Sequence, residues 1–250
     1  MAINTDKNVY TVIFASIMVV VVGAILASFA SGLRPRIDEN ERFAKQQNIL
    51  YAMGVNKNTE DSGVNFIPTS EVEGEFSKYI KEQYVLNNKG EVKPKEEAYL
   101  LDVKKQIAAM KSGKDAELPF FVGEKDGKKS YILPMYGKGL WDAIWGFVSL
   151  DENMVIQGVY FDHKGETAGL GANIKLRYFM DDFNGEYVLD GDQFKGVTVA
   201  KGNNDPLNND KEDYEVDALA GATITGNGVS VMIKESLNLY KPYLQTVRNN

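Results

Sequence analysis

An uncharged apolar stretch near the start of the chain sets the first limit on how it can fold. Residues 9–33 contain no Asp, Glu, Lys or Arg, and the centre, 12–30, consists mainly of Val, Ile, Ala, Met and Phe. A helix needs roughly 20 such residues to cross the hydrocarbon core of a bilayer. We therefore expect a transmembrane helix over residues 9–33, preceded by a short N-terminal tail over residues 1–8.

A cleaved signal peptide is the competing interpretation of this stretch. Ala27-Ser28-Phe29-Ala30 offers small residues at the spacing of a cleavage site. The apolar core of a signal peptide, however, is only about 7–15 residues long, which is shorter than the core seen here. An uncleaved anchor is therefore favoured.

Composition narrows the function classes open to the rest of the chain. The 250 residues carry a formal net charge of −7 without a basic block, which disfavours binding to nucleic acid. The absence of cysteine excludes disulfides, thiol chemistry and thiolate-ligated iron–sulfur clusters, and a single histidine gives poor support for haem ligation. Any redox role must therefore be carried by a bound cofactor.

A helical region is expected directly after the apolar stretch. Pro35 is expected to end the membrane helix, because proline removes a helical donor. Residues 40–53 then fit a second helix, which Gly54 stops. Residues 34–54 thus form a juxtamembrane helix.

The remaining residues, 55–250, are long enough for one sizeable domain. Apolar residues at helical spacing predict helices over 70–86 and 94–110, with a turn at 87–90 between them. Runs that alternate or stay apolar at strand length follow, with a hairpin turn at 125–128. The predicted strands are 118–122, 130–136, 143–150 and 154–162, with one or two more within 187–200.

These strands predict an antiparallel meander. The expected fold class is therefore α+β: a mixed or antiparallel sheet with flanking helices, carried on a single N-terminal transmembrane helix.

Two loops of the predicted sheet are candidate binding segments, residues 137–142 and 163–171. Both leave the same sheet, so either could line a cleft. The second loop combines polar groups that could contact the edge of a flat heterocycle with glycines that leave room for its ring, and apolar side chains could cover its face. The candidate residues are Trp141, Glu166, Thr167, Gly169, Leu170 and Gly171.

Each of these loops also has a purely structural interpretation. The glycines could make a tight strand-to-helix turn, and Trp141 could belong to the core. His163, the single histidine, has no cysteine, serine or carboxylate motif beside it and is expected to be solvated or to cap a turn.

The segment 219–228, Leu-Ala-Gly-Ala-Thr-Ile-Thr-Gly-Asn-Gly, places two hydroxyls just before a helical pattern over 229–240. Thr225 then falls near the N-terminus of a helix, where free N–H groups and the helix dipole favour an anion such as a phosphate. The neighbouring glycines would let a bulky phosphorylated group approach the backbone. Alternatively, Thr225 is only an N-cap and the glycines shape a turn.

This segment is similar to the flavinylation motif of membrane-bound flavoproteins, Ser/Thr-Gly-Ala-Thr/Ser-x-Thr, whose last threonine is esterified to the phosphate of FMN. The resemblance implies that Thr225 is the acceptor and that Gly221, Ala222 and Thr223 are its motif partners. Ala220 departs from the motif, because it stands where the family has Ser or Thr. Thr223 is the competing acceptor, since in an extended segment the two hydroxyls would share one side.

Three further segments carry the same resemblance. Residues 165–171 are similar to the Glu-Thr-Pro-Gly-Leu-Gly stretch of FMN-binding domains, with Ala168 in place of the proline, and residues 137–141 to their Gly-x-Gly-Leu-Trp turn. Residues 46–54 resemble a juxtamembrane segment of NqrC, the flavin-carrying C subunit of the sodium-translocating NADH:quinone reductases. The chain as a whole resembles the NqrC family.

The resemblance implies a redox relay in an oxidoreductase complex rather than an independent catalyst, with FMN covalently attached through threonine. It further implies other reductase subunits as partners and a flavin transferase that uses FAD during maturation. No residue of the chain is then required to act as an acid or base in the redox chemistry.

The resemblance also implies an inner-membrane protein with a single span and its flavin domain on the periplasmic side. The basic residues near the span argue for the opposite orientation, because cytoplasmic flanks are usually richer in Lys and Arg. Lys7 precedes the span, whereas Arg34, Arg36, Arg42 and Lys45 follow it. The orientation implied by the family is the one we expect.

Two alternatives remain open at this point. One is the G subunit of the related Rnf complex, which couples ferredoxin and NAD, although the helices predicted between anchor and sheet favour the quinone reductase family. The other is a membrane-anchored binding or assembly module without flavin.

Overall fold

The computed structural model describes residues 8–60, 62–202, 205 and 207–248. The chain divides into two compact units, one ending at Arg42 and one beginning at Phe43. Except for Asn8, the expected N-terminal tail lies outside the described residues. The second unit contains the sheet and every candidate site residue.

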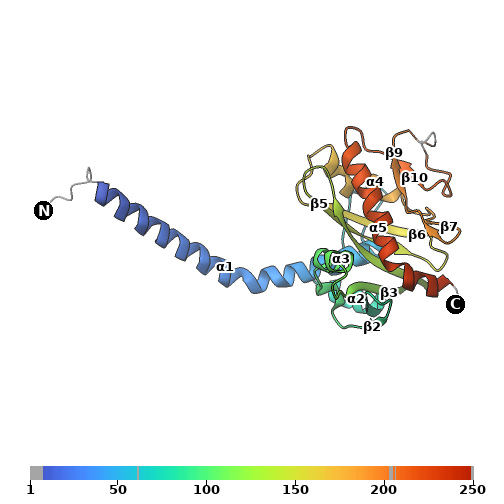
Figure 1. Ribbon diagram of the computed structural model, residues 1–250, viewed down its shortest axis with the longest axis horizontal. Helices are drawn as coiled ribbons and strands as arrows, with labels where there is room; N and C mark the ends of the chain where they lie inside the picture. Colours follow the sequence, from blue (N-terminus) through green and yellow to red (C-terminus); the bar gives the residue numbers. More distant parts are fainter. Residues whose placement is uncertain (1–7, 61, 203–204, 206, 249–250) are drawn as a thin grey trace. The chain divides into compact units, whose positions relative to one another are not determined.

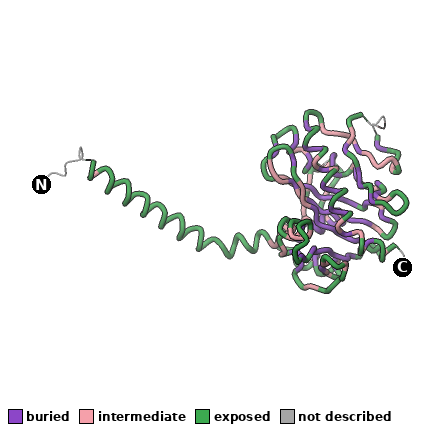
Figure 2. The backbone as a smooth tube through the Cα atoms, in the orientation of Figure 1, coloured by how far each residue is buried: buried purple, intermediate pink, exposed green. Residues whose placement is uncertain are grey.

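A single helix, α1 (Asn8–Ala52), covers both the apolar stretch and the juxtamembrane region (Figure 1). The expectation that Pro35 ends the membrane helix is therefore wrong, because Pro35 lies inside α1. A proline costs a helix one N–H donor and crowds the preceding turn, which can kink a helix without ending it. The most apolar window of α1 has a mean hydropathy of 2.7 and is entirely exposed (Figure 2), so the helix is long and apolar enough to cross a membrane.

The second unit is built on a six-stranded antiparallel sheet with the strand order β2-β1-β3-β4-β5-β6. The predicted meander corresponds to β3 to β6, and the α+β class with an antiparallel sheet and flanking helices is confirmed. The strands are β1 (Ile80–Leu86), β2 (Val92–Pro94), β3 (Leu118–Lys125), β4 (Lys128–Lys138), β5 (Ala143–Leu150) and β6 (Ile156–His163).

Short strand pairs follow the main sheet. An antiparallel pair consists of β7 (Leu189–Asp190) and β8 (Gln193–Phe194). A parallel pair consists of β9 (Thr198–Ala200) and β10 (Glu215–Asp217).

The predicted helix over 70–86 is wrong in its second half. A short helix, α2 (Val72–Tyr79), is followed immediately by β1, whose Tyr84 pairs with Phe120 of β3. The apolar spacing of this segment fits a helix locally, but pairing with a strand that lies far along the chain decides its structure.

The predicted helix over 94–110 is also shorter than expected. Its first part is the end of β2 and a 3₁₀ turn, η1 (Ala98–Leu100), and only α3 (Val103–Lys111) is α-helical. The side chain of Asp102 caps α3 by accepting a hydrogen bond from the backbone N–H of Lys105 at 3.1 Å. The predicted turn at 87–90 is therefore a hairpin turn between β1 and β2.

The sheet is covered on both faces. The long C-terminal helix, α5 (Thr223–Arg248), runs across one face (Figure 1). There the ring centroid of Tyr243 lies 4.2 Å from that of Phe120. Gly123 lies three residues further along β3 and so faces the other side. A Cβ on Gly123 would stand 2.6 Å from the sulfur of Met53, so the segment at the end of α1 packs against this second face.

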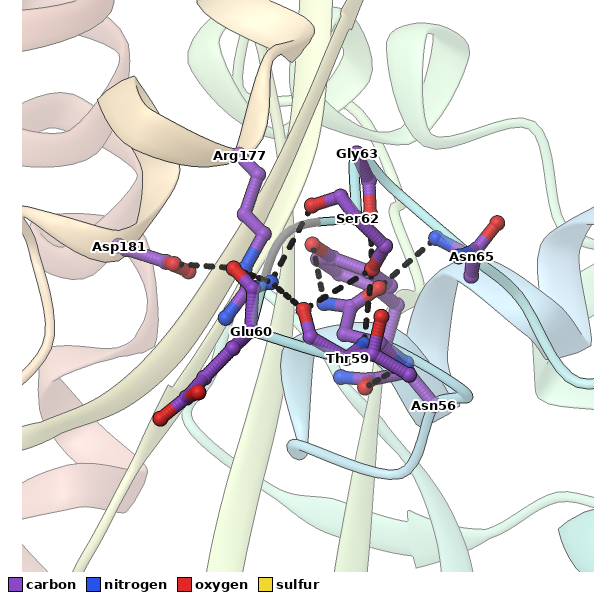
Figure 3. Close-up of polar contacts among 10 residues, drawn as sticks. Asn56, Thr59, Glu60, Ser62, Gly63, Asn65, Arg177 and Asp181 are labelled. Atoms are coloured by element: carbon purple, nitrogen blue, oxygen red, sulfur yellow. Dashed lines mark hydrogen bonds and ion pairs between the residues drawn. The ribbon is translucent and has the colours of Figure 1, made fainter.

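One arginine ties the segment after α1 to the region that follows β6. Arg177 begins the short helix α4 (Arg177–Asp181), which follows the 3₁₀ turn η2 (Gly171–Lys175). Its Nε donates to Asp181 at 2.9 Å, and its Nη1 donates to the carbonyl oxygen of Ser62 at 3.2 Å and to that of Thr59 (Figure 3). These hydrogen bonds hold the start of α4 against the segment that follows α1.

Candidate functional site

Three segments that are far apart in the sequence meet at one end of the sheet. They are the loop between β4 and β5 (residues 139–142), the loop after β6 (residues 164–170) and the first turn of α5. Glu166 joins all three, because its carboxylate accepts hydrogen bonds from the backbone N–H of Trp141 at 2.9 Å and from the hydroxyl of Thr225 at 2.5 Å. Residues from both predicted loops and from the predicted motif therefore form one cluster.

The start of α5 separates the two hydroxyls of the motif. The helix begins at Thr223, so Thr225 lies in its first turn, as expected, but inside the helix and not at its N-cap. Residues two apart in an α-helix point about 200° apart around the axis, so the expectation that both hydroxyls share one side is wrong. Thr223 is exposed, whereas Thr225 is 1% exposed and faces the loop after β6.

Glycines allow these segments to approach one another closely. A Cβ on Gly228 would lie 2.4 Å from the carbonyl oxygen of Lys138, which is closer than real Cβ contacts. A Cβ on Gly139 would lie 2.6 Å from Oε1 of Glu166. A larger residue at either position would push the hairpin loop away from α5 or from Glu166.

The carboxylate of Glu166 is buried and held by neutral donors. Oε2 accepts a hydrogen bond from the Thr225 hydroxyl, and Oε1 accepts one from the backbone N–H of Trp141. The residue is 7% exposed. Burial acts to raise the pKa of this carboxyl group, but hydrogen bonds from Thr225 and from the backbone N–H groups of Trp141, Asp142 and Leu140 outweigh it. The pKa of Glu166 therefore lies below its usual value, and the group is ionised at neutral pH.

On the side of the cluster that faces solvent, the apolar side chains of Trp141 and Leu170 lie near the hydroxyl of Thr167. The indole of Trp141 is 67% exposed, which excludes a core role, and its Nε1 donates to Oγ1 of Thr167 at 3.1 Å. Leu170 is 41% exposed and covers the turn before α5. In that turn Gly221 has a φ of +71°, and a Cβ on it would lie 2.8 Å from Cδ2 of Leu170, so both its backbone conformation and the contact favour glycine.

The other candidate residues shape the backbone. Ala222 is buried, and its carbonyl oxygen accepts the N–H of Gly226 in the first turn of α5. Gly169 is exposed, with a φ of +77° and no atom near its missing Cβ. The role of these residues in flavin binding stays a prediction.

His163 caps a turn, as expected for a histidine without a catalytic partner. Its Nδ1 accepts the backbone N–H of Glu166 at 3.2 Å, which helps to direct Glu166 towards α5. Among the described residues, there is no cluster of His, Cys, Asp and Glu side chains suited to a metal ion.

The predicted loop 137–142, one of the two expected to be able to line a cleft, lines a groove of about 740 Å³ beside Trp141. It lies between α3, β4 and α5, and its lining residues include Ile107, Tyr136, Lys138 and Val231. Apolar residues at helical spacing, as in α3 and α5, are typical of core positions. Sequence reasoning therefore singled out the loop, but not the walls that α3 and α5 contribute to the groove.

One protein-family model matches the part of the chain that contains this site. The family model described as "FMN-binding domain" matches residues 139–238, a range that contains every candidate site residue.

Two similar proteins match along nearly the whole chain. The C subunit of the Na(+)-translocating NADH-quinone reductase of Haemophilus ducreyi is 30% identical over 96% of this chain and 95% of its own length. That of Neisseria meningitidis serogroup A is 30% identical over 100% of this chain and 98% of its own.

Two solved structures similar to this chain are also C subunits of this reductase. The crystal structure of the corresponding Na(+)-translocating NADH-quinone reductase C subunit from Parabacteroides distasonis has a TM-score of 0.70 and 35% identity, covering 85% of this chain and 96% of its own. NqrC from Shewanella oneidensis has a TM-score of 0.63 and 25% identity, covering 83% and 99%.

Proposed function

Because the chain belongs to the NqrC family, the C subunits of Na(+)-translocating NADH-quinone reductases, we propose that it relays electrons in such a reductase through an FMN esterified to Thr225. The family's members are subunits of an oxidoreductase complex, so the chain acts with other subunits and not as an independent enzyme. A flavin transferase, with FAD as donor, installs the flavin during maturation.

The position of the Thr225 hydroxyl is the observation that carries this proposal. Of the two hydroxyls in the motif, only that of Thr225 is held by a buried carboxylate, at 2.5 Å from Glu166. Thr223 is exposed on the opposite side of the helix. A fixed orientation favours a hydroxyl as a nucleophile, which supports Thr225 over Thr223 as the acceptor.

The first turn of α5 suits a phosphate. Backbone N–H groups in a first turn have no partner within the helix, and the dipole places partial positive charge there. The phosphate of FMN, once esterified to Thr225, would lie in this field. The side chains around it also fit a flavin, because Trp141 and Leu170 offer exposed apolar faces beside the hydroxyl of Thr167.

FMN, when bound, supplies the reversible electron transfer that the side chains of this cysteine-free chain do not provide. The task of the protein is to position the ring. Trp141 and Leu170 would cover its faces, Thr167 would contact its polar edge, and Gly169 would leave space for it, whereas the buried Gly171 lets its segment approach Thr225 closely. Covalent attachment prevents loss of the cofactor during turnover.

Attachment requires the loop after β6 to move. Thr225 is 1% exposed, and Gly171 lies directly over its hydroxyl. A phosphate can reach this oxygen only if the segment near Gly171 is displaced. Gly169, with its left-handed backbone and open surroundings, gives that segment conformational freedom.

The apolar part of α1 would anchor the chain in the inner membrane, with the flavin domain on the periplasmic side. The length and hydropathy of α1 support the anchor, and the family supports the orientation. Protease added to intact spheroplasts should then degrade the domain, whereas inverted membrane vesicles should protect it. The reverse pattern would contradict the orientation.

The two alternatives are less well supported. The similar proteins that match along nearly the whole chain are C subunits of quinone reductases, which does not favour the G subunit of the Rnf complex. A flavin-free module would not account for the match to the FMN-binding domain.

Intact-mass analysis tests the proposal directly. The chain is co-produced with a flavin transferase, denatured and weighed, and its fluorescence is recorded on a gel. We expect the mass of one FMN ester on the wild type and on Thr223→Ala, and none on Thr225→Ala. A flavin adduct that persists on Thr225→Ala would overturn the assignment, and an unmodified wild-type chain would overturn covalent attachment altogether.

A further inference from the structure

Among the described residues, the buried carboxylate of Glu166 has no cationic partner. In the described part of the chain, no Lys, Arg or His side chain forms an ion pair with it, although the residue is only 7% exposed. Burying a charge without an opposite charge is costly. A neutral side chain of similar shape, such as glutamine, would avoid this cost. Such a group points to a chemical role more than to a stabilising one.

The carboxylate is also fixed in direction. Backbone N–H groups of the hairpin loop hold Oε1, with Trp141 at 2.9 Å and Asp142 at 3.5 Å. Oε2 is left facing the hydroxyl of Thr225 at 2.5 Å. The arrangement therefore places an ionised acceptor on the one proton that must leave when Thr225 is esterified.

We propose that Glu166 is the proton acceptor for Thr225 when the flavin is attached, so that this chain supplies the base for its own modification. The inference rests on the proposed function, since it requires Thr225 to be the acceptor. It assigns to Glu166 a task in maturation, distinct from a contact with the flavin ring.

The step balances without an oxidant or reductant. Oγ1 of Thr225 forms a bond to the flavin-side phosphorus of a flavin adenine dinucleotide, and the phosphoanhydride bond of the donor breaks. AMP leaves, and the hydroxyl proton passes to Oε2 of Glu166. Total charge is unchanged, because a carboxylate becomes neutral as the negative charge on the phosphates increases.

Phosphoryl transfer elsewhere uses the same geometry. In protein kinases an aspartate accepts the proton of the substrate hydroxyl, and catalysis is almost entirely positioning and electrostatic stabilisation. A weak base is therefore no obstacle here. General bases of this kind contribute roughly 10²–10⁴ in rate.

The test follows flavin attachment and not the activity of the loaded reductase. Full-length chain without flavin is purified in detergent and incubated with a flavin transferase and flavin adenine dinucleotide. Covalently bound flavin is measured by intact mass over time, at several values of pH from neutral to mildly alkaline. The variants are Glu166→Gln, Glu166→Asp and, as a matched control, Glu152→Gln, which changes an exposed glutamate in the turn after β5.

We expect Glu166→Gln to attach flavin about 100-fold more slowly than the wild type near pH 7, and Glu152→Gln to match the wild type. The ratio of wild-type to Glu166→Gln rates should fall as pH rises, because hydroxide replaces the missing base. Using this ratio cancels titration of the transferase itself. Glu166→Asp, which keeps a carboxylate, should be faster than Glu166→Gln and serves as the folded comparison if Gln disturbs the loop.

Equal rates for wild type and Glu166→Gln would overturn the proposal. A ratio that stays constant with pH would do so as well, because a purely structural role slows attachment equally at every pH. If the wild type itself gains no flavin at Thr225, the proposed function fails first, and the two failures are thereby distinguished.

Discussion

Gly171 lies so close to Thr225 that a Cβ on Gly171 would stand 2.5 Å from the hydroxyl oxygen and 2.6 Å from Oε2 of Glu166. The change Gly171→Ala must therefore move the loop or separate the two hydrogen-bonded groups. We expect flavin attachment to slow by at least about tenfold, equivalent to ~1.4 kcal/mol of lost transition-state stabilisation. Intact mass after a fixed incubation with the transferase measures this effect.

Gly165→Ala is the control for this prediction. Gly165 lies in the same loop, but the nearest atom to its Cβ would be Cβ of Asp142 at 3.8 Å, an ordinary contact. This variant should gain flavin at the wild-type rate. Equal rates for both alanine variants would show that contact with Thr225 does not limit attachment.

Removing the apolar half of α1 should release a folded soluble domain. Burial within the second unit begins near the end of α1, where Ile49 and Leu50 are fully buried, while residues 11–33 are exposed. A chain of residues 34–250 should therefore remain in the supernatant after centrifugation and unfold cooperatively, whereas the full chain should need detergent. Sedimentation of the shortened chain with membranes would contradict this expectation.

The parts of the fold that the sequence predicted are those governed by local pattern. The strands around Ile132, Val148 and Val159 combine apolar runs with polar turns, and all three residues are buried in neighbouring strands. The segment at 80–86 was wrongly predicted as helix, because Ile80 and Tyr84 continue the helical spacing of Val72 and Phe76. Only pairing with β3 makes it a strand, and that partner cannot be read from local spacing.

In the candidate site, too, local pattern identified the residues but not the contacts between distant segments. Motif resemblance selected Glu166 and Thr225 separately, but nothing in the sequence states that residues so far apart share a hydrogen bond. The expectation that Thr223 and Thr225 face one side assumed an extended chain. The helix begins at Thr223, and its 3.6-residue period turns the two hydroxyls away from each other.

Tyr240→Phe should destabilise the domain without affecting the flavin site. Tyr240 is fully buried, and its hydroxyl donates to the carbonyl oxygen of Pro119 at 2.8 Å, joining α5 to β3. Loss of this buried hydrogen bond should cost about 1 kcal/mol in the free energy of unfolding. Chemical denaturation measures the change. Tyr187→Phe, at a partly exposed position, should stay within about 0.5 kcal/mol of the wild type, and a similar loss in both variants would contradict the assignment.

Glu186 should make the stability of the domain depend on pH. The residue is fully buried, with Nδ2 of Asn208 at 3.0 Å and Nζ of Lys211 at 3.3 Å from Oε1. Burial raises the pKa of Glu186 from its ordinary 4.5 to about 7, against the opposing effects of Lys211 and Asn208. The folded state therefore binds more protons than the unfolded state between these values, and stability is lost as pH rises from 4.5 to about 7.

Glu186→Gln should abolish this dependence, because an amide stays neutral while keeping an oxygen for Asn208 and Lys211. The free energy of unfolding of the variant relative to the wild type should rise between pH 5 and pH 8, by up to about 3 kcal/mol. Denaturant titrations at the two pH values measure this difference. Glu212→Gln, at an exposed glutamate on the same segment as Lys211, should show no such trend. A difference for Glu186→Gln that does not change with pH would mean that Glu186 is already ionised in the folded protein at pH 5, with Lys211 compensating its burial.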